Sequence, residues 1–216
     1  TIDFDIFLPH SVIDAFFVLG NILIFCFAII GFYRFWKALK GASKGNNISF
    51  ARGLSLTLKE IITHEKFLKC GKNRPRAIAH YLVLAGFVSA MIATGLVLLF
   101  AFLPHYINVD PVWWPPLELP NPVKIFGAVG GIGLLVGSSM LIYRRWANRD
   151  EVGANGYADY LFLYVIFLTG LSGMLSWIAR AYIGAPMLAY VIYFIHIVLV
   201  FFLLWYMPYS KFAHMI

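Results

Sequence analysis

Long apolar segments alternate with short polar ones along the whole chain. Five of the apolar segments reach the length of roughly 20 residues that a helix needs to cross a bilayer core about 30 Å thick. They cover about residues 12–36, 78–103, 123–146, 157–181 and 186–208. The pattern therefore predicts an all-α, integral membrane five-helix bundle in which residues 1–216 form a single transmembrane domain.

The amino-acid composition agrees with this prediction. Hydrophobic residues make up 61% of the chain and charged residues only 12%, whereas soluble domains carry about 25% charged residues. This excludes a soluble globular fold and a disordered chain. The first span follows Asp3 and Asp5 rather than a basic stretch, so we interpret it as a membrane helix and not as a cleaved signal peptide. The two cysteines, Cys26 and Cys70, are too few for a disulfide framework or for an iron–sulfur cluster carried by this chain alone.

Positive charge is concentrated on one side of the predicted bundle. Ten of the 17 Lys and Arg residues lie between Lys37 and Arg76, and the connection between the third and fourth spans adds Arg144, Arg145 and Arg149. Because Lys and Arg favour cytoplasmic loops, we expect the N-terminus outside, the C-terminus in the cytoplasm and the chain in the cytoplasmic membrane. The net charge of +7 is then a topology signal and an attraction for anionic lipid, rather than a sign of a nucleic-acid partner.

Two connections have a distinctive composition. From Ser49 to Cys70, apolar residues recur at helical spacing among charged ones. This predicts an amphipathic helix between spans 1 and 2 that lies along the inner membrane surface or against a partner, and that Pro75 terminates. The outer loop, residues 104–122, contains six prolines and two tryptophans, which predicts a rigid cap at the level of the lipid headgroups.

Glycine is concentrated in the third span. Gly127, Gly130, Gly131 and Gly133 have spacings that occur in dinucleotide-binding loops, but no strand precedes them and they lie within a span. The pairs Gly127/Gly131 and Gly133/Gly137 are each four residues apart, which lets two membrane helices approach closely. The same small residues could equally make room for a flat cofactor.

The histidines are the main candidates for chemistry, because an ionisable residue inside a membrane is a functional hypothesis by default. His196 and His214 are 18 residues apart, which places them on one helix face and about 27 Å apart along the axis. His80 begins the second span at the depth at which His214 follows the fifth. Two imidazoles from antiparallel helices can bind haem iron from both sides, whereas zinc would need three or four clustered ligands. For each histidine, a simple interfacial hydrogen-bonding role stays open.

The fifth span carries a resemblance to a known family. The stretch 194–214, with both histidines at their spacing and Pro208 before a Tyr-Ser-Lys run, resembles the last span of the gamma subunit of respiratory nitrate reductase. The segment 64–70, followed by two arginines and His80, is similar to the membrane subunits of heterodisulfide-reductase-type complexes. Among these it is most like the membrane subunit of the quinone-interacting membrane-bound oxidoreductase. The resemblance covers essentially all five spans, with specific motifs only in the second and the fifth.

The resemblance implies a haem b-containing membrane subunit of a respiratory redox complex of the kind used in anaerobic respiration. Such a subunit passes electrons between a membrane quinone, menaquinone or another, and cytoplasmic iron–sulfur or flavin subunits of a heterodisulfide reductase-like complex. It has no soluble catalytic domain, so it is not an enzyme by itself.

The resemblance also implies which residues bind the haem groups. His80 and His214 would hold an inner haem. The nitrate reductase pattern has a further histidine ten residues after the first, and this chain has Ala90 there, so His196 serves either a second haem with another partner or the quinone. The candidates to complete iron coordination beside His196 are Met91, His10 and His105. Arg76 and Arg144 lie where the propionates of the inner haem would emerge, and Arg180 is placed similarly on the outer side; each is equally explained as a topology charge.

A second class of function stays open at this point. In it, the chain is a cofactor-free membrane anchor or a transporter-like subunit, and the histidines relay protons or stabilise the fold. Asp14 and Asp159, which begin the first and fourth spans, could carry quinone protons in the redox hypothesis. A carboxylate in the first turn also stabilises any helix through the macrodipole.

Overall fold

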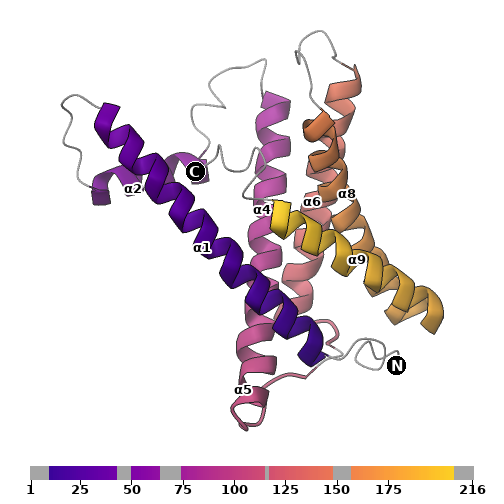
Figure 1. Ribbon diagram of the computed structural model, residues 1–216. Helices are drawn as coiled ribbons and strands as arrows, with labels where there is room; N and C mark the ends of the chain where they lie inside the picture. Colours follow the sequence, from indigo (N-terminus) through magenta and orange to yellow (C-terminus); the bar gives the residue numbers. More distant parts are fainter. Residues whose placement is uncertain (1–9, 43–49, 64–73, 115–116, 148–156, 207–216) are drawn as a thin grey trace.

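The computed structural model describes residues 10–42, 50–63, 74–114, 117–147 and 157–206, and these residues form helices and loops without any strand. Five helices are long and apolar enough to cross a membrane, which confirms the predicted all-α architecture with five spans. They are α1 (His10–Ala42), α4 (Arg74–Val97), α6 (Pro122–Ala147), α8 (Tyr157–Ile178) and α9 (Pro186–Tyr206). The shorter α2 (Phe50–Thr63) follows α1 and precedes α4 along the chain (Figure 1).

The second and fourth spans are longer than their α-helical parts. After α4, the helical path continues through a π-helical turn, η3 (Leu98–Phe102), into the short α5 (Leu103–Tyr106). The fourth span likewise ends in a π-helical turn, η4 (Ala179–Ile183), before Gly184, whose φ of 68° is favourable only for glycine. Both π-helical turns lie at the same end of the bundle as the loop before α6 (Figure 1).

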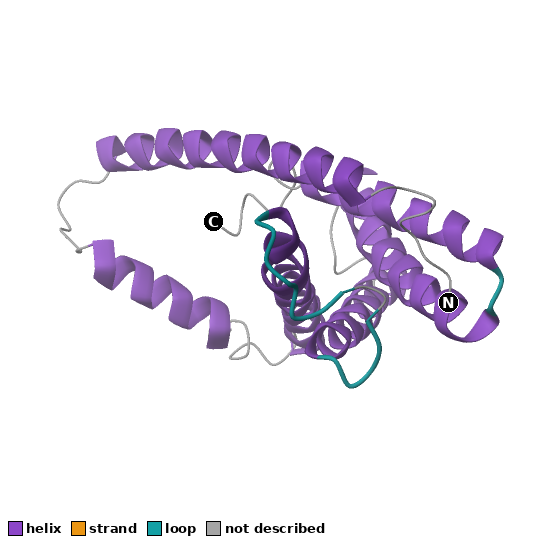
Figure 2. Ribbon diagram, turned by 90° about the horizontal axis from the view of Figure 1, so that it is seen from below, coloured by secondary structure: helices purple, strands orange, loops and turns teal. Residues whose placement is uncertain are grey.

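Part of the predicted amphipathic segment lies in the described residues, and that part is helical. The structure gives α2 as Phe50–Thr63, and residues 64–73 lie outside the described part. Pro75 does not terminate that helix, because it is the second residue of α4. Proline is well tolerated there, since its missing N–H would have no partner within the helix. In the described residues α2 is not one of the extensively packed helices (Figure 2), so its position at the membrane surface stays a prediction.

A row of glycines brings α6 directly onto the backbone of α4. A Cβ added to Gly137 would lie 2.8 Å from the backbone oxygen of Ala79, and one added to Gly133 would lie 3.0 Å from that of Leu82. The packing interpretation is therefore confirmed for Gly133 and Gly137. It is wrong for Gly127, where an added Cβ would meet nothing within 4 Å.

Gly131 belongs to a different interface from Gly133 and Gly137. A Cβ on Gly131 would lie 2.6 Å from the sulfur of Met174, which is on α8. Because 100° separates successive residues of a helix, neighbouring glycines of α6 face two different partners. The glycine-rich segment thus packs α6 between α4 and α8.

The long helices pack in chain order, α4 on α6, α6 on α8 and α8 on α9, while α1 packs on α9. A small core joins α4, α6, α8 and α9. It is formed by Val83, Leu134, Val165, Ile166 and Leu203. In the described part of the chain, α4 and α9 are not an extensively packed pair. Many large apolar side chains point outward instead, as expected for helices surrounded by lipid.

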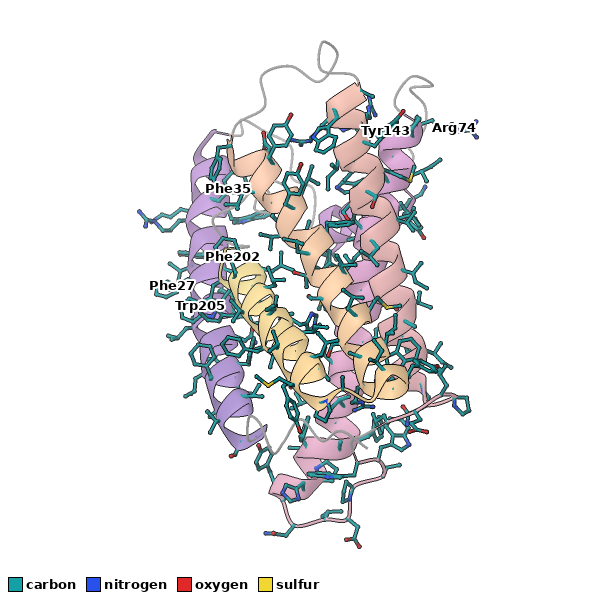
Figure 3. All side chains as sticks on the ribbon, turned by 90° about the vertical axis from the view of Figure 1, so that its right-hand side faces the viewer. Phe27, Phe35, Arg74, Tyr143, Phe202 and Trp205 are labelled. Carbon is teal, nitrogen blue, oxygen red and sulfur yellow. The ribbon has the colours of Figure 1, made fainter. Side chains whose placement is uncertain are left out.

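The first helix is attached through aromatic side chains near the end of α9. A Cβ on Gly20 would lie 3.1 Å from the Trp205 ring, and the Phe16 ring centroid is 5.1 Å from that of Phe201. Figure 3 shows Trp205 lying beside α1. Gly20 therefore provides the depression on α1 into which the indole fits.

The two ends of the bundle differ in charge. One end, which we call the basic end, is where α1 and α6 finish and α4 and α8 begin, and it carries Arg34, Lys37, Arg74, Arg76, Arg144 and Arg145. The opposite end, which we call the loop end, is covered by residues 107–114 and 117–121 (Figure 1). The predicted orientation, with the basic end in the cytoplasm, stays a prediction from the charge distribution.

The connection at the loop end folds back over the helices as the proline and tryptophan content suggested. The Trp113 ring lies 5.1 Å from that of Phe100, and the amide groups of Val112 and Trp113 donate to the Phe100 carbonyl. Arg180 of η4 donates from Nη2 to the Leu117 carbonyl at 3.2 Å. These contacts join the loop to both the second and the fourth spans.

Candidate functional site

His196 lies at the middle of α9, half-buried against α8. It is the eleventh of the 21 residues of that helix, so it lies about 15 Å along the axis from Pro186. Every other described residue from Val191 to Trp205 is apolar or aromatic. An imidazole at this depth has no water to satisfy its nitrogens and must find its partners in neighbouring helices.

The partner is a serine of α8. The Oγ atom of Ser172 lies 3.0 Å from Nδ1 of His196, which is a normal hydrogen-bond distance. The Ser172 hydroxyl also donates to the Thr169 carbonyl at 3.1 Å. Within the described residues, the partners of this ring are the Ser172 hydroxyl and the backbone carbonyl of Thr169.

A glycine of α8 makes room for the ring. A Cβ added to Gly173 would lie 2.9 Å from Cε1 of His196, 3.4 Å from Nδ1 and 3.6 Å from Nε2. The imidazole therefore lies against the backbone of α8, at a place where any larger residue would push it away. We call Ser172, Gly173 and the Thr169 carbonyl the imidazole slot.

Sequence reasoning singled out His196 but missed the slot. The sequence feature that could have indicated the slot is a set of hydroxyl residues in an otherwise apolar span. They are Thr169, Ser172 and Ser176, at spacings of three and four. All three are buried, with 6–7% of their surface exposed. These positions fall on one face of α8, because residues three, four and seven apart share a face of a helix. Such a stripe identifies the face that receives a polar partner, but it does not identify that partner.

His80, the predicted ligand of the inner haem among the described residues, is at the basic end. His80 is half-buried and lies six residues after the start of α4, about 9 Å along its axis. Its neighbour in sequence, Ala79, is buried against Gly137 of α6. The His80 side chain therefore projects from α4 beside the contact surface between α4 and α6.

Two of the predicted arginines share this end of the bundle with His80. Arg76 is exposed on the first turns of α4, and Arg144 is half-buried near the end of α6, with its Nη1 atom enclosed by protein. Asp159 is also here, buried in the first turn of α8 with 8% of its surface exposed. Among the described residues, the basic end thus brings one imidazole, His80, together with several charged groups, of which Arg144 and Asp159 are at least partly buried.

Four predicted ligands are placed away from His196 or are not described. His214 lies outside the described residues. His10 begins α1 at the loop end, and its side chain is not described. Met91 has 69% of its surface exposed, so it points outward from the described bundle. His105 is exposed and packs on the Trp114 ring at 4.8 Å, also at the loop end.

The structure gives a physical reason for Ala90, where the resembled family has a histidine. A Cβ on Gly130 of α6 would lie 3.0 Å from the amide nitrogen of Ala90 and 3.3 Å from its Cβ. This position therefore faces the backbone of α6 in the close-packed seam. A histidine there would force the two helices apart, and a small residue is what this packing requires.

A second basic group of residues lies at the loop end. The ammonium of Lys124 lies 5.5 Å from the centre of the Trp177 ring, close enough for a cation–π interaction. It is near enough to Arg180 for the two positive charges to repel one another, while Glu118 attracts it. Arg180, the predicted outer propionate partner, is held toward the loop by the Leu117 carbonyl.

The described residues offer single imidazoles rather than a cluster of metal ligands. These residues contain no group of three or more His, Cys, Asp or Glu side chains that could hold a metal ion. Haem iron needs only one or two axial ligands, because the porphyrin supplies the other four. His196 offers one imidazole whose Nδ1 is engaged, in apolar surroundings, which is how a ligating histidine is usually arranged.

Comparisons with protein-family models, with curated proteins and with solved structures give no match.

Proposed function

We propose that this chain is the haem b-containing membrane subunit of a respiratory redox complex, passing electrons between a membrane quinone and a cytoplasmic iron–sulfur or flavin partner. The observation that carries the proposal is the His196 imidazole, held through Nδ1 by Ser172 in the interior of an apolar bundle. A histidine in such a place has a function by default. The resemblance of residues 194–214 to the last span of the nitrate reductase gamma subunit gives that function its chemistry.

Each candidate residue has a definite task in the proposal. When bound, haem supplies one-electron transfer, which no side chain of this chain can supply. His80 and His214 bind the inner haem at the basic end, where Arg76 and Arg144 neutralise its propionates. His196 would bind iron of a second haem, with Arg180 at its propionates, or it would hydrogen-bond the quinone. Met91 is not placed to share that iron, because its side chain points outward from the described bundle. The packing of Ala90 against Gly130 supports a ligand other than residue 90.

The apolar bundle itself contributes to electron transfer. Ligands held on packed helices keep their geometry when the iron changes its charge. Because water is excluded, little solvent has to reorient between the oxidised and reduced forms. The glycine contacts between α4 and α6 fix His80 relative to the rest of the bundle. Fixed ligands in a dry interior are the arrangement that fast electron transfer needs.

The cytoplasmic partner would dock at the basic end, through α2. Arg52 and Lys59 are both exposed and seven residues apart, so they share one face of this helix. Leu54 lies roughly on the opposite face. One face is thus suited to the membrane surface and the other to an acidic partner surface.

Reversing the charge of this face should detach the partner. In the double variant Arg52→Glu, Lys59→Glu we expect the partner subunits to bind about tenfold more weakly, which corresponds to about 1.4 kcal/mol. The amount of partner that co-purifies with the chain from native membranes measures this. Lys37→Glu, on α1 at the same end, is the control and should retain full stoichiometry. Equal loss in both variants would show that overall charge matters and the α2 face does not.

The proposal is tested by the cofactor content of the purified chain. Acid–acetone extraction should release haem b, giving one or two haem groups per chain in a pyridine haemochrome assay. A chain that carries no extractable haem after expression in haem-sufficient cells contradicts the proposal. That result would favour a cofactor-free membrane anchor, in which the imidazole slot only joins α8 to α9.

A further inference from the structure

We infer that Ser172 and Gly173 are positioning residues: they fix the tautomer and orientation of His196, so that Nε2 keeps the lone pair with which this histidine binds iron. The inference rests on the proposed function for the identity of the metal, but its first half concerns the imidazole alone. It adds two residues of α8 to a site that the sequence attributed to α4 and α9.

The tautomer follows from counting protons at the Ser172 hydroxyl. A serine hydroxyl has one hydrogen to donate and two lone pairs to accept with. Its hydrogen is directed to the Thr169 carbonyl, which can only accept, at 3.1 Å. With its hydrogen on the carbonyl, the serine oxygen accepts in the 3.0 Å contact with His196, and we assign the ring hydrogen to Nδ1 on this basis. A neutral imidazole protonated at Nδ1 has its lone pair on Nε2.

The orientation follows from Gly173. The ring lies against the α8 backbone, where an added Cβ would be 2.9 Å from Cε1. Contact at this distance is closer than van der Waals packing allows, so an alanine would displace the ring and stretch the bond to Ser172. Since no water is present at this depth to replace that bond, the displaced imidazole would lose its fixed tautomer.

The hydrogen bond at Nδ1 also affects the electronic properties of the ligand. A histidine that donates its second N–H becomes a more basic ligand at the other nitrogen, and loss of such a partner weakens metal binding about 10–100-fold. A more basic ligand stabilises the oxidised iron. Loss of the Ser172 bond should therefore raise the midpoint potential of the haem that His196 binds.

The experiment compares matched variants of the full chain in lipid nanodiscs. Ser172→Ala should weaken retention of the His196 haem at least tenfold or raise its midpoint potential, and Ser172→Thr, which restores a hydroxyl, should return both toward the original values. Ser176→Ala is the control, because Ser176 is equally buried one turn further along α8. Gly173→Ala should turn this haem high-spin or abolish its binding, whereas Gly127→Ala, with open space at its Cβ, should not.

The outcomes separate this inference from the proposed function. If haem is present and Ser172→Ala matches Ser176→Ala in potential and retention, the inference is overturned while the proposed function stands. The inference is also overturned if His196→Ala leaves every haem unchanged.

If the purified chain contains no haem, the proposed function fails, and nitrogen-15 NMR of the imidazoles decides the first half of the inference. The His196 signals are assigned through their absence in His196→Ala. A protonated Nδ1 that becomes a tautomer mixture in Ser172→Ala supports the fixed tautomer, and a protonated Nε2 in the unsubstituted chain overturns it.

Discussion

Replacing His80 by alanine should abolish the inner haem and stop electron transfer between quinone and the cytoplasmic partner. In the proposal His80 and His214 bind the same iron, so either substitution leaves the iron with one protein ligand. The haem should then become high-spin or be lost from the protein. We expect His80→Ala and His214→Ala to give the same reduced-minus-oxidised spectrum, with one b-type component missing. Quinol-dependent reduction of the partner should fall by at least 100-fold, because the remaining distance is too long without a relay.

The matched control for this prediction is His105→Ala. His105 is an exposed histidine at the loop end, packed on Trp114, and its loss should change neither the spectrum nor the rate. His196→Ala should leave the inner component intact. Unchanged bis-histidine spectra in both His80→Ala and His214→Ala would contradict the pairing.

Replacing Gly137 by leucine should separate α4 from α6 and disturb the basic end. The first atom of the new side chain would already lie 2.8 Å from the Ala79 oxygen and 2.8 Å from Cγ2 of Val83. Both are in a packed seam, where overpacking costs about 1–3 kcal/mol and more when backbone must move. Because Ala79 precedes His80, the shift should also reduce occupancy of the inner haem.

Thermal unfolding in detergent measures the first effect, and haem content after purification measures the second. Gly127→Leu is the control on the same helix, since an added Cβ there would meet nothing within 4 Å. We expect a clear fall in the Tm of the Gly137 variant and little change in the Gly127 variant. Equal stability of the two would mean that the α4–α6 seam does not hold the bundle together.

The contrast between Gly127 and Gly137 also shows what the sequence could predict. Hydrophobic length alone located all five spans to within a few residues, because lipid requires each crossing helix to be long and uniformly apolar. The same uniformity hides which face of a helix meets which neighbour. The spacing of the glycines was therefore informative about close packing, but it assigned Gly127 to an interface that the structure does not have and left Gly130 out.

The candidate site was predictable in part for a similar reason. His196 is recognisable from sequence because a polar residue inside an apolar span is costly. Ser172 and Gly173 are ordinary residues for a membrane helix, where small residues commonly serve packing. Only the rotation and depth of α8 relative to α9 bring them to the imidazole, and those depend on tertiary contacts spread along both helices.

The end of the amphipathic segment illustrates a local error. Pro75 was interpreted as the terminator of the helix before it, but in the structure it lies in the first turn of α4. Proline is compatible with both positions, since it cannot donate a hydrogen bond to a preceding turn and needs no partner in a first turn. The residues on either side do not distinguish the two cases.

Anaerobic addition of a reduced quinone analogue such as menadiol to the purified chain, followed by its visible spectrum, tests the central claim most directly. The account predicts that menadiol reduces the haem and produces a b-type α-band. The amplitude of this band should be a substantial fraction of the amplitude obtained with dithionite. Removal of His80 should abolish the inner component of this band, and removal of His105 should not. A spectrum that stays flat with both reductants would contradict the account, and a band that only dithionite develops would contradict the role of the quinone.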